Sequence, residues 1–388
     1  MKKYFLAVAS FFIYSHISLG QVYPGQMDST FVPVRSHHYD PELTFDFCVN
    51  EPAWNNQAGI HSAFGSTDRL YFRKEVPVNH NNDLSSSYST TVWRGERANA
   101  QILVWSSEAL EQVRVSTQDL RSAEGNIIPK DRITFELVRY VLSNYPYAEK
   151  KAICGESPYK SGFLMPDRFE TLDRFDLPSQ TTRPVWMMVD VPRGTAPGTY
   201  KGQVEVRAKG KAPQLLNLEI VVQKQLLPYP KDWKYRLDLW QNPWAVAWYN
   251  HVEPWSPEHK MLLKQHLKHY ADAGGTYITT YGVHSPWSDN SYMIEGGMIE
   301  WIKKADGTWA FDYKIFDEYV ELAMECGIDE AITLYTPIPW GFRHRYKDEA
   351  TGDYSYINWA PSSEEFKKMW NIFLTDFKFH LEAKSWLD

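Results

Sequence analysis

Residues 226–241 read LLPYPKDWKYRLDLWQ, and the pattern of the sequence changes within this stretch. On its N-terminal side, short runs of β-branched and apolar residues alternate with turn residues, which is typical of β-strands. On its C-terminal side, such runs alternate with longer segments of helical periodicity. Pro228 and Pro230 stand at the change, where proline disfavours the continuation of a strand or helix. The sequence therefore predicts two domains, at residues 21–228 and 229–388.

The N-terminal domain is predicted to be an antiparallel β-sandwich. Val204 and Val206 alternate with Glu205, and this alternation indicates a strand with one buried and one solvated face. No helical periodicity competes with the strand pattern, and a run of such strands buries its apolar faces by packing two sheets together. The predicted strands span residues 98–105, 113–120, 133–142, 185–191, 200–208 and 215–222.

Two stretches of this domain lack strand periodicity. Asn79–Ser89 is polar and low in complexity, and Ser143–Arg183 is long and has no clear pattern. Structureless loops of that length are uncommon inside a compact domain. The longer stretch is therefore interpreted either as an arm packed on a neighbouring domain or as a functional surface loop.

The C-terminal half reads as a βαβαβα repeat, which is typical of a parallel sheet covered by helices. Ser256-Pro257 supplies an N-cap and an N1 proline for the first helix. The second helix carries an apolar face over residues 316–324, and Ser362-x-x-Glu365 forms a capping box ahead of the third. The expected strands span residues 236–241, 276–283 and 328–336, and the third helix is expected to bury Phe366, Met369, Trp370, Phe373, Leu374 and Phe377.

Three βα units correspond to the beginning of a (β/α)8 TIM barrel, which has eight units and typically needs about 250 residues. The expected fold class is therefore multidomain β plus α/β, with a β-sandwich followed by the first three units of a TIM barrel. A three-stranded parallel sheet with an unpaired edge is a poor free-standing domain, so the barrel is expected to be incomplete in this sequence.

The beginning of the sequence has the features of a secretory signal peptide. Lys2 and Lys3 precede the mostly apolar run Phe5–Tyr14, and small residues follow at Ser18–Gly20. The apolar run is too short for a transmembrane anchor, which needs about 20 residues. Residues 1–20 are therefore interpreted as a signal peptide, and the protein is expected to be periplasmic, at the cell surface or secreted.

Charge, cysteine and histidine content narrow the possible partners. The net charge of −7 is mild and no basic stripe is present, so nucleic acid is not expected as a partner.

The three cysteines are too few for a disulfide framework. Two possibilities stay open: a bridge between Cys48 and Cys154, or three free thiols. His259, His266 and His269 favour a solvated helix face over a metal site, because they form no His-Glu-x-x-His motif. No metal or cofactor is expected.

Short motifs follow one another along nearly the whole chain after residue 20. In the N-terminal half they are Phe64–Asp68, Val92–Gln101, Pro184–Trp186 and Val191–Gly202, and Leu237–Pro243 begins the second half. The order and spacing of these motifs resemble glycoside hydrolase family 123. The first four resemble its N-terminal sandwich domain, and the last resembles the start of its catalytic barrel.

The resemblance implies a retaining β-N-acetylgalactosaminidase that acts on terminal GalNAc of glycans or glycolipids and uses no cofactor. It implies substrate-assisted catalysis, in which the 2-acetamido oxygen attacks the anomeric carbon. An adjacent Asp-Glu pair assists: the Asp orients the acetamido group, and the Glu is general acid and then base.

In the family this Asp-Glu pair lies on the fourth barrel strand. The third expected strand ends at residue 336, and the sequence stops before a fourth strand begins. The pair is therefore expected beyond Asp388, the last residue of the sequence. The chain is accordingly expected to be an inactive fragment of an active parent, with no catalytic residue of its own. Asp329-Glu330 stands at the bottom of the expected barrel and is interpreted as a surface turn.

Residues at the strand ends are the remaining candidates for a sugar site, because barrel active sites lie at the carboxyl ends of the strands. The chain contains 16 Trp, 24 Tyr and 19 Phe, and such rings stack on sugars as well as filling cores. The aromatic candidates are expected to stack on sugar and the polar ones to bind hydroxyl groups. The predicted substrate-binding residues are Asp238, Trp240, Gln241, His284, Trp287, Tyr335 and Trp340.

Two other functions stay open. One is a non-catalytic secreted glycan-binding protein, in which the aromatic residues bind sugar without cleaving it. The other is a barrel glycosidase with different catalytic carboxylates and another sugar specificity.

Overall fold

The computed structural model describes residues 51–77, 84–143, 163–286 and 296–387. These residues form two compact units, and the chain passes from the first to the second between Leu227 and Pro228. The expected signal peptide, Cys48, Cys154 and Asp388 lie outside the described residues. Export and the disulfide bridge therefore stay predictions.

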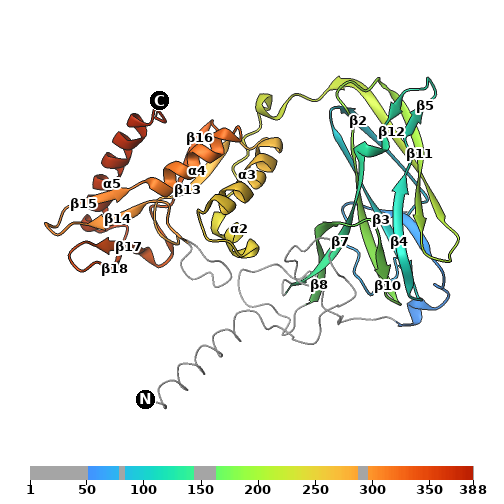
Figure 1. The fold of residues 1–388 in the computed structure, drawn as a ribbon, viewed down its shortest axis with the longest axis horizontal. Coiled ribbons are helices and arrows are strands. Elements are labelled where there is room, and N and C mark those ends of the chain that lie inside the picture. Colours follow the sequence, from blue (N-terminus) through green and yellow to red (C-terminus); the bar gives the residue numbers. More distant parts are fainter. Residues whose placement is uncertain (1–50, 78–83, 144–162, 287–295, 388) are drawn as a thin grey trace, which may run out of the picture. The chain divides into compact units, whose positions relative to one another are not determined.

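The N-terminal unit is built from two β-sheets (Figure 1). One sheet contains, in spatial order and with every neighbouring pair antiparallel, β1 (His61–Gly65), β3 (Arg97–Ser106), β10 (Thr181–Asp190), β7 (Ile133–Ser143) and β8 (Phe163–Thr171). The other contains, in spatial order, β2 (Ser87–Arg94), β12 (Gln214–Leu226), β11 (Gly198–Arg207), β4 (Leu110–Thr117) and β9 (Phe175–Leu177), with β5 (Leu120–Ser122) and β6 (Ile127–Ile128) beside β11. Because β2 pairs in parallel with β12, the expectation of a purely antiparallel sandwich is wrong at that pair.

Apolar side chains from both sheets meet in one core, which makes the unit a β-sandwich. Val204 and Val206 of β11 are buried in it while Arg207 is exposed, as the alternation predicts. Ile102 and Val104 of β3 belong to the same cluster. The six strands predicted from periodicity are present as β3, β4, β7, β10, β11 and β12. The strand predicted over residues 113–120 begins and ends three residues earlier, as β4.

The prediction of a patternless segment over residues 143–183 is wrong for its described part. Residues 163–171 form β8, which pairs with β7 as an edge strand. The pairing shifts register where Arg139 and Tyr140 stand opposite Arg168 and Pro166. This β-bulge interrupts the two-residue alternation, and so the strand carries no periodic signal. Residues 144–162 lie outside the described part of the chain.

The C-terminal unit combines helices with two small sheets. Its helices are α2 (Pro243–Asn250), α3 (Pro257–Asp272), α4 (Lys314–Glu325) and α5 (Glu364–Ala383). One sheet is the parallel pair β13 (Tyr277–Tyr281) and β16 (Ala331–Tyr335). The other has the spatial order β15 (Trp309–Asp312), β14 (Glu300–Lys303), β17 (Arg343–Asp348) and β18 (Tyr354–Asn358).

The three helices predicted from periodicity and caps are present as α3, α4 and α5. Ser256 caps α3 as expected, and its hydroxyl accepts a hydrogen bond from the His259 amide at 3.2 Å. The predicted cap of α5 is wrong by one residue, because Ser363 rather than Ser362 accepts from the Phe366 amide, at 3.1 Å. Leu374 was expected in the buried face of α5 but is 50% exposed.

The strand predicted over residues 236–241 does not form. Only Leu237 makes a bridge, in parallel with Gly275. The backbone groups around it bond to a side chain instead: the Tyr270 hydroxyl donates to the Leu237 carbonyl at 2.7 Å and accepts from the Leu239 amide at 3.3 Å. The parallel sheet therefore has two strands rather than the expected three, and the TIM barrel stays a prediction.

The four-stranded sheet was not predicted, and it lies in the segments that follow β13 and β16. Its inner face packs on α5, where the Trp301 ring stacks on Phe373 with ring centroids 4.8 Å apart. Trp359 and Trp370 join the same core. This aromatic cluster anchors both hairpins of the sheet to a long helix. None of the helices in the described ranges has the length and apolar character needed to cross a bilayer.

Candidate functional site

Asp238 ties the segment before α2 to both parallel strands. The Thr279 hydroxyl of β13 donates to its Oδ1 at 3.0 Å, and the Thr333 hydroxyl of β16 donates to its Oδ2 at 2.9 Å. Each carboxylate oxygen keeps a second lone pair for a ligand hydroxyl. Asp238 therefore has a structural role that the sequence did not indicate, and it retains the capacity to accept from sugar.

Trp240 and Tyr335 are brought together at the ends of neighbouring segments. Their ring centroids lie 4.9 Å apart, and their planes are inclined by 47°. Tyr335 is the last residue of β16, while Trp240 comes from the segment that precedes α2. The Trp240 side chain is 62% exposed, which leaves indole surface open to solvent. Exposed aromatic surface of this kind suits the C–H face of a pyranose ring.

Gln241 is anchored from two sides by tyrosines. Its carbonyl accepts from the Tyr281 hydroxyl at 2.8 Å, and its side-chain Oε1 accepts from the Tyr319 hydroxyl at 2.7 Å. Burial raises the pKa of Tyr319 far above its usual range, so this hydroxyl remains a donor. Because Oε1 is already engaged, the amide nitrogen is the group of Gln241 best suited to bind a ligand.

His284 follows β13 and is largely buried. Burial, and then the charges of Arg345 and Arg343, lower its pKa to about 4, so the imidazole is neutral near pH 7. No residue in the described ranges hydrogen-bonds its Nδ1, which is itself buried. A neutral imidazole has one donor and one acceptor nitrogen, so His284 has an uncommitted polar group at a strand end.

The segments that follow β13 and β16 meet at Pro286 and Trp340. The Trp340 amide donates to the Pro286 carbonyl at 2.9 Å, and the Trp340 side chain is 59% exposed. Trp340 opens a 3-10 turn, η4 (Trp340–Phe342), which leads into β17. Trp287 was expected beside them, but it lies outside the described residues. Of the seven predicted residues, the structure thus pairs Trp240 with Tyr335 and brings the segments of His284 and Trp340 together.

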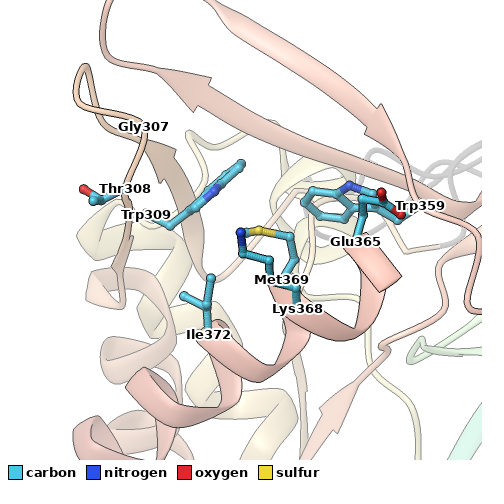
Figure 2. Close-up of a pocket in the computed structure, with 8 residues that line it drawn as sticks. All are labelled: Gly307, Thr308, Trp309, Trp359, Glu365, Lys368, Met369 and Ile372. Carbon is cyan, nitrogen blue, oxygen red and sulfur yellow. The ribbon is translucent and has the colours of Figure 1, made fainter. Parts of the chain in front are cut away.

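Two of the pockets lined by described residues belong to this unit. One, of about 290 Å³, lies between residues 239–243 and helices α2 and α3, and Trp240 and Gln241 line part of it. The other, of about 530 Å³, lies between the start of β15 and α5, and none of the predicted site residues lines it. Figure 2 shows Trp309 and Trp359 on its walls with Met369 between them. Neither pocket joins Trp240 to His284.

The three adjacent Asp-Glu pairs of the sequence are all occupied by structural contacts. At Asp329-Glu330, just before β16, Glu330 accepts from the Thr276 hydroxyl at 2.8 Å. At Asp317-Glu318 on α4, Asp317 pairs with His380 at 2.7 Å and with Lys384 at 2.9 Å, and Glu318 pairs with Lys260 at 3.2 Å. At Asp348-Glu349, Glu349 pairs with Lys304 at 2.8 Å. None of the three pairs stands at the carboxyl end of β13 or β16.

The catalytic pair itself was expected beyond Asp388, on a fourth barrel strand. The described part of the chain ends at Leu387, so Asp388 lies outside it. In this part, α5 is the last element, and it is followed by residues 384–387, which form no strand. The position of the catalytic pair beyond Asp388 therefore stays a prediction.

The interpretation of the α3 histidines as a solvated face is wrong for His259. This side chain is fully buried, its Nδ1 accepts from the Trp255 amide at 2.8 Å, and its Nε2 lies 2.9 Å from the Pro243 carbonyl. It thereby joins α2 to α3. The described ranges contain no group of three or more His, Cys, Asp or Glu side chains that would hold a metal ion.

Sequence reasoning missed the cationic residues beside His284. Arg343 and Arg345 lie on β17 and alternate with His344 and Tyr346, which are buried. This alternation over residues 343–348 has the period of a strand, but six residues are too few for a reliable pattern. Its shortness, and its place in an expected loop, concealed it.

Solved structures include a close match in fold. A family 123 glycoside hydrolase from Clostridium perfringens, studied for glycolipid glycan hydrolysis, matches with 26% identity and a TM-score of 0.74. The match covers 85% of this chain and 57% of that one, so the chain spans little more than half of its length. A PapD-like domain of human CEP192 matches at 11% identity and a TM-score of 0.21, covering 48% of this chain and 99% of that one. A Bacteroides ovatus GH5 xyloglucanase matches at 8% identity and a TM-score of 0.19, covering 64% of this chain and 43% of that one.

Family models match both units of the chain. The model of the glycoside hydrolase 123 N-terminal domain matches residues 64–208, and that of the glycoside hydrolase 123 catalytic domain matches residues 240–388. No curated protein matches the chain. The two models follow one another in the order of the two units and agree with the structural match. The chain belongs to glycoside hydrolase family 123.

Proposed function

We propose that the protein is a retaining β-N-acetylgalactosaminidase that removes terminal GalNAc from glycans or glycolipids. The observation that carries this proposal is the Trp240–Tyr335 pair, with ring centroids 4.9 Å apart, at the end of a parallel strand of a family 123 catalytic unit. An open aromatic surface at that place suits stacking on a pyranose ring. The glycolipid glycan hydrolysis studied in the Clostridium perfringens relative supports a glycan or glycolipid substrate.

The proposed chemistry uses the 2-acetamido group of the substrate. Its carbonyl oxygen attacks the anomeric carbon as a Glu donates a proton to the leaving glycosidic oxygen, which gives a cyclic intermediate and a free aglycone. The same Glu then takes a proton from water as the water attacks the anomeric carbon, so the configuration is retained. The Asp beside it orients the acetamido N–H.

Within this scheme the described residues bind the sugar. Trp240 and Tyr335 stack on the ring, while the carboxylate of Asp238 and the imidazole of His284 bind hydroxyl groups. The amide nitrogen of Gln241 donates a further hydrogen bond. We also propose that the catalytic unit is a (β/α)8 barrel and that the protein is exported through residues 1–20.

We further propose that none of the three Asp-Glu pairs of this sequence is the catalytic pair, because each is held in structural contacts away from the strand ends. The pair that acts on substrate would then lie beyond Asp388. The 388-residue chain is expected to bind β-GalNAc glycosides without cleaving them, whereas a version that carries the complete catalytic domain of the family is expected to hydrolyse aryl β-GalNAc. Hydrolysis by the 388-residue chain itself would contradict this assignment of the pairs.

The acetamido mechanism is tested with N-trifluoroacetyl substrates in the version with the complete domain. Fluorine withdraws electrons from the amide oxygen, so kcat is expected to fall steeply relative to the N-acetyl substrate. An enzyme that used a carboxylate nucleophile would tolerate this change. Equal kcat values for the two substrates would therefore exclude substrate assistance, and preference for an aryl β-galactoside or β-GlcNAc would exclude the GalNAc assignment.

The sugar-binding residues are tested with Trp240→Ala in the 388-residue chain. Loss of one aromatic contact is expected to weaken binding of methyl β-GalNAc about two- to tenfold, equivalent to about 0.5–1.5 kcal/mol. Isothermal titration calorimetry gives the dissociation constants. Trp93→Ala, which removes an exposed indole from the sandwich unit, serves as the matched control and is expected to bind as the unaltered chain does. Unchanged affinity in Trp240→Ala would remove this residue from the site.

A further inference from the structure

The outer face of the four-stranded sheet carries arginines and tyrosines. Residues two apart in a strand point to the same side, so Arg343 and Arg345 of β17 share a face opposite the buried His344. Tyr354 and Tyr356 of β18 lie on that same outer face, and each of these residues is about half exposed. A solvent-facing surface of cations and aromatic rings is thereby formed in the segments that follow β13 and β16.

Each guanidinium of this surface lies over the ring of a tyrosine. The Arg343 Cζ lies 3.8 Å from the centroid of Tyr356, and the Arg345 Cζ lies 4.2 Å from that of Tyr354. A cation–π contact of this kind restrains the position of the guanidinium, which still has N–H groups to donate. The two side chains are thus pre-organised as planar, fork-shaped donors.

Glu300 is the carboxylate paired with one of these donors among the described residues. Arg345 has one carboxylate, Glu300, at 3.6 Å, and Glu300 also accepts from the Tyr354 hydroxyl at 3.0 Å. The buried Nε of Arg345 has no hydrogen-bond partner there. Arg343 is exposed and makes no ion pair with any residue in the described ranges. The exposed N–H groups of Arg343 therefore have no carboxylate partner in the described ranges and are available to an anion.

The position of this surface connects it to the proposed sugar site. His284 lies three residues after the end of β13, and the positive charges of Arg345 and Arg343 contribute to lowering its pKa. The Pro286–Trp340 hydrogen bond joins the segment of His284 to the one that leads into β17. The start of β17 therefore lies next to the segments that carry the predicted sugar-binding residues His284 and Trp340.

We propose that Arg343 and Arg345 bind an anionic substituent of the substrate glycan, either a sulfate ester or a carboxylate. The inference rests on the proposed GalNAc-specific function and names a subclass of its substrates. Guanidinium forks match the planar pair of oxygens of a carboxylate and two oxygens of a sulfate. Tyr354 and Tyr356 hold the forks in position and offer exposed ring surface to the adjoining sugar.

The test compares neutral and anionic probes on the 388-residue chain by isothermal titration calorimetry at low ionic strength. The probes are methyl β-GalNAc, its 6-O-sulfate, and a trisaccharide in which terminal β-GalNAc adjoins a sialic acid. The anionic probes are expected to bind about tenfold tighter than the neutral one, as one or two charge-assisted hydrogen bonds provide. Arg343→Gln is expected to abolish this preference and to leave the affinity for methyl β-GalNAc unchanged.

Lys347→Gln is the matched control, because it removes one positive charge from the same face of the same strand. If the anion binds at a local site, Lys347→Gln is expected to retain the preference for anionic probes. If a diffuse positive field attracts the anion, Lys347→Gln and Arg343→Gln are expected to lose this preference equally. Equal affinity for neutral and anionic probes, or equal loss in both variants, overturns the inference. A preference limited to the sulfated or to the sialylated probe identifies the source of the anion. Anionic preference without measurable binding of methyl β-GalNAc would count against the GalNAc assignment alone.

Discussion

Asp238 shows at the residue scale how one carboxylate replaces strand pairing. The segment around it makes a single bridge to a neighbouring segment, yet it is held against both parallel strands through Thr279 and Thr333. The Tyr270 hydroxyl completes the attachment by bonding to the backbone on either side of Asp238. Trp240, two residues further on, depends on this attachment for its position next to Tyr335.

Substitution of Asp238 by Asn is therefore expected to lower stability as well as ligand affinity. The amide nitrogen of Asn cannot accept a hydrogen bond from a threonine, so one threonine hydroxyl loses its acceptor. This loss is expected to lower the free energy of unfolding by about 1–2 kcal/mol. Urea unfolding followed by tryptophan fluorescence measures this loss. Asp353→Asn, on an exposed turn, is the control and is expected to unfold as the unaltered protein does. Equal midpoints for the two variants would show that the threonine contacts contribute nothing.

His344 gives the protein a defined response to acid. It is almost fully buried, its Nδ1 lies 3.1 Å from the Phe342 carbonyl, and its Nε2 accepts from the Trp370 indole at 3.4 Å. A carbonyl only accepts, so Nδ1 carries the proton and the ring is neutral. Burial, as the main cause, lowers its pKa from 6.5 to about 4.

The unfolded chain therefore binds the His344 proton more readily than the folded one. The contribution of this residue to stability is complete above pH 6.5, declines as the pH falls from 6.5 to about 4, and does not change further below that. Over this pH range the free energy of unfolding is expected to fall by on the order of 3 kcal/mol. Urea unfolding at several pH values is expected to show a shallower pH dependence in His344→Gln than in the unaltered protein. Parallel curves would mean that His344 does not titrate differently in the two states.

At the scale of elements, helix ends follow local rules that a sequence displays directly. Ser362 and Ser363 are both suitable caps for α5, and the capping-box pattern favours the first. The structure uses Ser363, whose hydroxyl accepts from the Phe366 amide. The choice depends on how the chain enters the helix from Trp359, which is buried against the four-stranded sheet. Tertiary packing thus overrides the local signal of the capping box.

The two serines provide a paired test of that assignment. Ser363→Ala removes the acceptor of an otherwise unpaired helical N–H group and is expected to destabilise the protein by about 1 kcal/mol. Ser362→Ala changes an exposed hydroxyl outside the helix and is expected to have a negligible effect. Thermal unfolding of the two variants under identical conditions measures the difference. The reverse order of stabilities would restore Ser362 as the cap.

Periodicity predicted the elements that bury one face, and it failed where another interaction replaced the pattern. Six strands of the sandwich and three helices were predicted in this way, whereas β8 was concealed by its bulge. The hairpins β14–β15 and β17–β18 consist of strands of four to six residues, which are too short for a reliable pattern. The approach of Trp240 to Tyr335 was predictable because the ends of parallel segments meet. The tyrosines that anchor Gln241 were not, since they lie far away in the sequence and on different elements.

At the scale of the whole molecule, the two units differ in how completely they bury their apolar residues. The core of the sandwich unit draws on both of its sheets. The second unit has its own core, but its parallel sheet contains only two strands and several of its large side chains are exposed, including Leu239, Ile338 and Phe379. Exposed apolar surface contributes little to stability. The second unit is therefore expected to be the less stable of the two.

Calorimetry of the 388-residue chain is accordingly expected to show two transitions, with the C-terminal unit unfolding first. Tryptophan and helix signals both report on the C-terminal unit. Of the 16 tryptophans, 12 lie after residue 227, and all α-helices of the described ranges lie there too. Tryptophan fluorescence and ellipticity at the helical band near 222 nm should therefore follow the first transition. Residues 21–227 produced alone should retain only the second, because their core is internal to the sandwich. A single transition with coincident signals would instead mean that the two units unfold as one cooperative structure.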